Sequence, residues 1–147
     1  MLGRYVGVFR KLFCNVGILF CCTGLFSVSY SNNSSCDNLI SSTNVVRSEP
    51  FLLHYSFSPE KPVTGTYTDL LLTICEGTQP VKGRIKVEAV MPAHGHGMNY
   101  LPKITQVTDG NYVAKGLLFH MPGLWQIAVR LQQEGDSTLF KINNRVP

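Results

Sequence analysis

The chain has 147 residues, a formal net charge of +4, a pI near 8.9 and five cysteines. This length allows one domain of ordinary size with its own hydrophobic core. Three of the thirteen basic residues lie in the first thirty, which leaves ten basic against nine acidic residues and a net charge of about +1. Such a balanced remainder shows no basic run typical of nucleic-acid binding, so we expect no nucleic-acid partner.

Residues 1–29 have the composition of a targeting segment. Arg4, Arg10 and Lys11 precede an apolar run over 12–26, and Ser27-Val28-Ser29 then supplies small residues before Tyr30. This order predicts a signal peptide that is cleaved before Tyr30 and an exported, periplasmic protein. An alternative stays open: an uncleaved N-terminal helix that anchors the protein to the inner membrane, with its basic residues on the cytoplasmic side. Membrane contact is expected only through this segment, if it is uncleaved.

Residues 30–48 are rich in Ser and Asn and poor in apolar residues, which predicts a linker. Beyond the leader, the chain keeps only Cys36 and Cys75. In an oxidising compartment, two remaining cysteines favour one disulfide. The alternative is two separate buried thiols, because sequence does not give the distance between them. Residues 49–147 then form the folded domain.

The domain contains a series of strand-like segments separated by turn-forming residues. Period-two alternation or runs of β-branched and aromatic residues predict strands. Asp109-Gly110 between two such segments is typical of a tight hairpin. In one predicted strand Trp125, Ile127, Val129 and Leu131 share a face, which we expect to point into the core. The predicted strands cover residues 51–57, 66–75, 84–91, 104–107, 112–119, 124–131 and 137–142.

The pattern as a whole predicts the fold class. About seven short strands with turns every ten residues or so, and no helical periodicity, indicate an all-β protein. We therefore expect a single immunoglobulin-like β-sandwich after the N-terminal segment.

The clearest chemical feature is a cluster of histidine and methionine. Met91-Pro92-Ala93-His94-Gly95-His96-Gly97-Met98 is followed later by His120-Met121. In an extended chain side chains alternate, so His94, His96 and Met98 can point the same way. Imidazole binds several transition metals and thioether sulfur favours Cu(I), which predicts a site for Cu(I) or Cu(II). The predicted ligands are His94, His96, Met98, His120 and Met121.

Two other interpretations of this segment compete. Pro92, Gly95 and Gly97 also suit an ordinary turn, and Met91 has the strand parity of a core residue. A zinc site is less favoured, because the sequence after the leader has no Cys-x-x-Cys pair and no His-Glu-x-x-His helix.

The same residues carry a family resemblance. The chain combines Met91-Pro92-x-His94-x-His96-Gly97-Met98, Gly110-x-Tyr112 and Phe119-x-Met121-Pro122-Gly123-x-Trp125-x-Ile127. This pattern resembles the YtkA-like domain family over roughly residues 51–131. These are exported bacterial β-sandwich domains, related in pattern to FixH-like proteins. The resemblance implies a periplasmic or surface domain at 49–147 and a role in copper handling.

Two functions follow as hypotheses. The first is an exported module that binds copper through the His/Met loop, for storage or for delivery to a copper-receiving or envelope protein. The second is a metal-free interaction or assembly module of the cell envelope. The sequence shows no acid–base pair, nucleophile arrangement or phosphate-binding loop, so we do not expect an enzyme.

Overall fold

The computed structural model describes residues 36–37 and 39–147, all within a compact unit that spans Asn32–Pro147. The predicted signal peptide or anchor and the first residues of the predicted linker lie outside the described residues. Within the part that is described, no helix is long and apolar enough to cross a membrane. The elements are η1 (Leu39–Ser41), β1 (Val45–Ser48), β2 (Phe51–Ser58), β3 (Tyr67–Glu76), β4 (Gln79–Pro80), β5 (Arg84–Met91), β6 (His96–Gly97), β7 (Lys103–Thr108), β8 (Asn111–Leu118), β9 (Gly123–Gln133) and β10 (Asp136–Val146).

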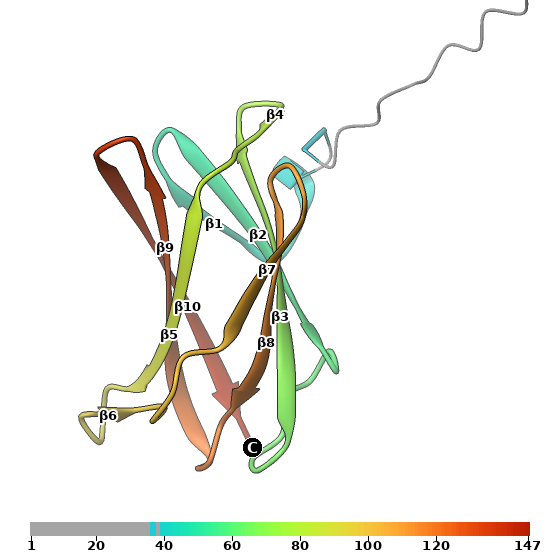
Figure 1. Ribbon diagram of the computed structural model, residues 1–147. Helices are drawn as coiled ribbons and strands as arrows, with labels where there is room; N and C mark the ends of the chain where they lie inside the picture. Colours follow the sequence, from blue (N-terminus) through green and yellow to red (C-terminus); the bar gives the residue numbers. More distant parts are fainter. Residues whose placement is uncertain (1–35, 38) are drawn as a thin grey trace, which may run out of the picture. The chain divides into compact units, whose positions relative to one another are not determined.

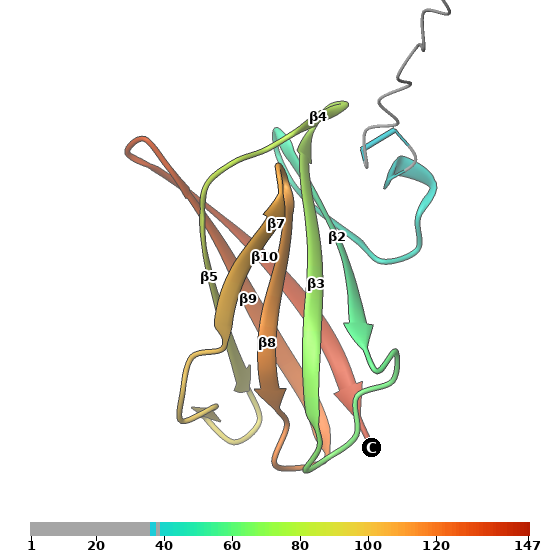
Figure 2. The same cartoon turned by 45° about the vertical axis from the view of Figure 1, so that its right-hand side comes forward.

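The strands form two antiparallel sheets packed face to face (Figure 1 and Figure 2). Sheet A has the order β1-β2-β3-β8-β7, with β4 also paired to β3, and sheet B has the order β10-β9-β5-β6. The seven predicted strands correspond to β2, β3, β5, β7, β8, β9 and β10. Their distribution, four neighbours in one sheet and three in the other, is the arrangement of an immunoglobulin constant-type domain. The structure therefore confirms the predicted all-β sandwich, and three short strands (β1, β4 and β6) bring the total to ten.

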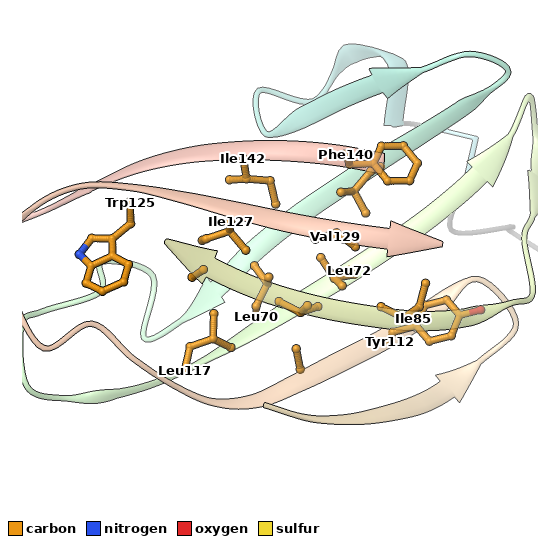
Figure 3. Close-up of a cluster of buried hydrophobic side chains, with 14 of the residues drawn as sticks. Leu70, Leu72, Ile85, Tyr112, Leu117, Trp125, Ile127, Val129, Phe140 and Ile142 are labelled. Carbon is orange, nitrogen blue, oxygen red and sulfur yellow. The ribbon is translucent and has the colours of Figure 1, made fainter. Parts of the chain in front are cut away.

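The core lies between the sheets and follows the alternation of the sequence. In β5, Ile85, Val87, Ala89 and Met91 are buried, while Arg84 and Lys86 are exposed. On β9 the buried positions are those predicted, and the Trp125 side chain is 0% exposed. Figure 3 shows Trp125 at one end of the cluster, with Ile127 and Val129 following it along the same strand.

The N-terminal part of the domain differs from the prediction. The predicted linker over 30–48 includes β1, which pairs with β2 through contacts such as Val46 opposite Leu53. The folded domain thus begins before residue 49. Cys36 and Cys75 form a disulfide with their Cα atoms 6.0 Å apart, which confirms the predicted pairing. Together with Leu39, these two cysteines make a small buried cluster separate from the main core.

Candidate metal centre

The predicted His/Met loop lies where β5 ends and the chain turns back. Met91, the last residue of β5, is 2% exposed, and its carbonyl accepts hydrogen bonds from the backbone N–H groups of His94 (3.1 Å) and Gly95 (3.0 Å). Gly95 has φ +67°, a left-handed conformation that glycine adopts at little cost. The turn directs His96 back alongside Met91, so that His96 and Gly97 form β6.

Close backbone packing holds β6 against β5. The N–H of Met98 donates to the carbonyl of Ala89 at 3.0 Å, and a Cβ placed on Gly97 would lie 2.7 Å from the same oxygen. Only glycine fits at this distance. A turn separates His94 from His96, so the alternation of an extended chain, which would let His94, His96 and Met98 point the same way, does not extend across these residues.

The fold nevertheless brings the three predicted histidines together. His120 follows the end of β8, and its ring stacks on that of His96, with centroids 5.3 Å apart and planes 30° apart. The His94 ring also contacts that of His96, with centroids 5.8 Å apart. All three side chains are exposed. The result is a row of imidazoles contributed by two segments at one end of the sandwich.

The two predicted methionine ligands lie deeper than the histidines. Met98 and Met121 are half-buried and pack against the main core. Met98 lies two residues after His96, and Met121 directly follows His120, so the thioethers and imidazoles come from the same two segments. At this end of the domain the imidazoles are exposed, whereas the two thioethers are partly buried.

Trp125 belongs to this region as well. Its indole lies edge-on to the His120 ring, with centroids 5.2 Å apart, and its Nε1–H donates to the carbonyl of Met121 at 3.0 Å. The Phe119 ring also contacts the indole, with centroids 5.3 Å apart. The sequence placed Trp125 in the core but gave no indication of its contact with His120, which depends on how the chain turns between β8 and β9.

The donor set decides which metals suit this region. Among the described residues, the side chains of His, Cys, Asp and Glu form no group of three or more that could hold a metal ion. Structural zinc sites use four ligands of these types, so the described residues do not provide one. Two neighbouring imidazoles supplemented by thioether sulfur fit a softer ion better, and this combination suits copper.

Comparison with known proteins places the chain in a family. The family model described as YtkA-like matches residues 54–130, just over half of the chain. The chain belongs to the YtkA-like family. The YtkA-like match contains all five predicted ligands and Trp125, whereas Cys36 and β10 lie outside it.

A solved structure is similar in fold to this YtkA-like protein. A DUF4426 family protein from Pseudomonas aeruginosa PAO1 is similar with a TM-score of 0.50 and 13% sequence identity. The similarity covers 69% of this chain and 94% of that one. At this identity the likeness shows the fold alone. A comparison with curated proteins found no match.

Proposed function

We propose that this YtkA-like protein is an exported, periplasmic module that binds one copper ion at the end of its β-sandwich. In the proposed site His96 and His120 form the central pair, Met98 and Met121 supply thioether sulfur, and His94 lies at the edge of the site beside His96. The observation that carries the proposal is the 5.3 Å separation of the His96 and His120 rings, which belong to two segments far apart in the sequence.

The ring separation is compatible with a shared ion. A metal bound to one nitrogen of each of two imidazoles at about 2 Å holds the ring centres about 4.5 to 6 Å apart, depending on the angle at the metal. The observed value of 5.3 Å falls within this interval. The two rings are stacked in this structure, so the proposed binding requires the exposed side chains to rotate until one nitrogen of each ring faces the ion.

Copper is favoured over other ions by the chemistry of the donors. Thioether ligands prefer the soft Cu(I) ion, whereas imidazole also permits Cu(II). Exposed histidines are accessible to a second protein, and ligand exchange with such a protein requires that access. We therefore propose that a copper-receiving protein of the envelope is the partner of this site.

A second function is supported by apolar residues beside the same turn. Tyr100 is 40% exposed and Leu101 is 59% exposed, and both line a depression of about 260 Å³ that also includes Met98. Exposed apolar side chains around a depression are typical of protein contacts. In this alternative the protein is a metal-free assembly module, and the histidine turn contacts another protein directly.

Equilibrium copper binding distinguishes the two functions. The fragment from Tyr30 onward contains every described strand and the disulfide. We expect it to bind Cu(I) in competition with a chelator more tightly than about micromolar Kd, near −8 kcal/mol. Replacing His96 or His120 by Ala should weaken binding about tenfold or more, a loss of about 1.4 kcal/mol.

His54→Ala is the matched control, since His54 lies on β2 of sheet A and is not part of the histidine row. Its affinity should equal that of the wild type. Wild-type protein that binds neither Cu(I) nor Cu(II) would leave the metal-free assembly function as the better explanation.

A further inference from the structure

The outer face of sheet B collects basic side chains from three strands. Residues that point away from the core alternate with buried ones along β5, β9 and β10. Among these outward residues are five cations, which we call the basic face: Arg84, Lys86, Arg130, Lys141 and Arg145. The strands β10, β9 and β5 are consecutive neighbours in the sheet (Figure 1), so the five side chains share one continuous surface.

This distribution is strongly asymmetric. Residues 30–147 contain ten basic and nine acidic side chains, and half of the basic ones lie on the basic face. Glu88 is the one acidic residue at the outward positions of β5, β9 and β10. A domain that is almost neutral as a whole therefore presents five positive charges and one negative charge at these outward positions, and Glu134 and Asp136 lie beside Arg84 at the β9–β10 turn.

Most cations of the basic face form no ion pair with the described residues. Lys86 forms an ion pair with Glu88 at 2.9 Å, but the described residues provide no ion pair for the other four cations. Lys86 also lies directly opposite Arg130 on the neighbouring strand. Like charges in opposed positions destabilise a sheet, so the sequence places cations together here at some cost to the fold.

The other side chains of this surface narrow the choice of partner. Val90 and Leu124 are each 42% exposed and point outward at the end of the sheet near the histidine row. The outward positions of the three strands include no aromatic residue on which a nucleic-acid base could stack. Tyr100, which lines a depression with Val90 and Gln126 of this surface, donates its hydroxyl to the carbonyl of Gly116. Cations spread over a broad sheet, with exposed aliphatic side chains at one end, complement a planar anionic layer with an apolar interior.

We propose that the basic face docks on the surface of an anionic phospholipid bilayer. Each Lys or Arg near such a surface contributes a favourable interaction with the lipid phosphates, and Val90 and Leu124 can enter the headgroup region. This goes beyond copper binding and does not depend on it, because none of the five cations is a proposed ligand. It is also separate from any anchoring by the N-terminal segment, which the tested fragment lacks.

The test uses the metal-free fragment from Tyr30 onward and sedimentation with lipid vesicles. We expect binding to vesicles of phosphatidylglycerol and phosphatidylcholine in equal parts, and none to pure phosphatidylcholine. Removal of one cation should weaken the partition coefficient about fivefold, so Arg130→Gln with Lys141→Gln should weaken it about 25-fold. Raising the ionic strength from about 0.01 M to about 1 M shortens the Debye length about tenfold and should release the protein.

A matched control is available in sheet A. Lys103 and Lys115 are an opposed pair of exposed cations on β7 and β8. Lys103→Gln with Lys115→Gln removes the same charge and should leave vesicle binding within about twofold of the wild type, less than the fivefold expected for one basic-face cation. Thermal unfolding shows that each variant is folded, and Arg84→Gln with Arg145→Gln provides a second basic-face pair.

Three results of the vesicle experiments would overturn the proposal. These are failure of the wild-type fragment to bind the anionic vesicles at low ionic strength, equal losses in the basic-face and control variants, and equal binding to neutral vesicles. Retention on double-stranded DNA without binding to anionic vesicles would also reject it, in favour of a nucleic-acid partner. Copper affinity is measured separately, so failure here leaves the copper proposal unaffected.

Discussion

The indole of Trp125 holds the His120 side of the candidate metal centre in place. The two rings meet edge to face with centroids 5.2 Å apart, and the indole N–H also donates to the carbonyl of Met121 at 3.0 Å. Because Trp125 is fully buried, its contacts hold two consecutive predicted ligands, His120 and Met121, in position. Backbone hydrogen bonds to Met91 and Ala89 hold the His94–His96 turn on β5, but among the described residues no buried aromatic ring contacts the imidazole of His94 or His96. Adjustment to a bound ion is therefore expected mainly on that side.

Replacement of Trp125 tests this role through stability. Trp125→Ala should lower the free energy of unfolding by about 3 to 5 kcal/mol, because it removes the largest fully buried side chain of the core. Urea denaturation of wild type and variant measures this difference. Trp125→Phe keeps an aromatic ring but removes the indole donor, so it should cost less stability. A loss below about 1 kcal/mol for the alanine variant would contradict the core position of Trp125.

The histidine row predicts a ranking of copper ligands. His96 contacts both other imidazoles, whereas His94 contacts only His96 among the histidines. His96→Ala and His120→Ala should therefore weaken copper binding more than His94→Ala. Competition titrations of the three single variants give the order. A larger loss for His94→Ala than for His120→Ala would place the ion at the turn and not between the two segments.

The thioether contribution needs a volume-conserving substitution. Met98 packs against the core, so Met98→Ala would lower stability as well as affinity. Met98→Leu retains most of the packing and removes the sulfur. We expect it to weaken Cu(I) binding more than Cu(II) binding, because a soft thioether favours the reduced ion. Parallel affinity measurements for both oxidation states check this, and equal losses would remove Met98 from the ligand set.

The disulfide should contribute substantially to stability. It joins residues separated by 39 positions and connects the segment before β1 to β3 in sheet A. Loop closure of this length in the unfolded chain predicts a contribution of about 3 to 4 kcal/mol. Cys36→Ala with Cys75→Ala should lose this amount in urea denaturation. Under reducing conditions the wild type should approach the variant, and an unchanged midpoint would show that the packing of Cys36 and Leu39 holds the segment without the bond.

The sequence predicts the principal strands well where alternation is regular and the ends are marked. Buried and exposed residues alternate over 84–91, and Gly83 and Pro92 flank the segment, so the predicted range equals that of β5. β1 was missed because its four residues follow a Ser/Asn-rich segment and gain order by pairing with β2. β6 has only two residues and is defined by its hydrogen bonds to β5, which no local pattern encodes.

For the candidate site, too, the sequence predicts the residue types but not the contacts between distant segments. Residue types alone identified the histidines and methionines, but the contact between His96 and His120 depends on the packing of two segments separated by β7 and β8. The basic face could not be predicted from the sequence for a related reason. Its cations occupy alternate positions in three separate segments, so the sequence contains no basic run, and only the pairing of β5, β9 and β10 makes them neighbours.

The last prediction concerns His54, the histidine outside the row. It lies on the outer face of sheet A in a depression of about 430 Å³ that is lined by Leu71, Thr73 and Asn111, among others. Burial lowers the pKa of His54 below its ordinary value of 6.5, because the depression disfavours the charged imidazolium. The other titratable side chain that lines this depression is Tyr112, whose pKa is raised by burial, so it stays neutral in the same range.

The sign of the effect on stability follows from proton binding. Between the lowered pKa in the folded state and the ordinary value in the unfolded state, the unfolded chain binds more protons. Stability contributed by neutral His54 is therefore complete above about pH 7 and is lost as the pH falls through about 6.5 towards the folded-state pKa.

His54→Gln should show a smaller decrease in the free energy of unfolding between about pH 7 and pH 5 than the wild type. This pH range is chosen because most carboxylates remain ionised in it and contribute little to the change. Urea denaturation at several pH values measures both profiles. Ser56→Ala, in the same depression, should keep the wild-type profile. Parallel profiles for His54→Gln and the wild type would show that the imidazole is as well solvated in the folded protein as in the unfolded chain.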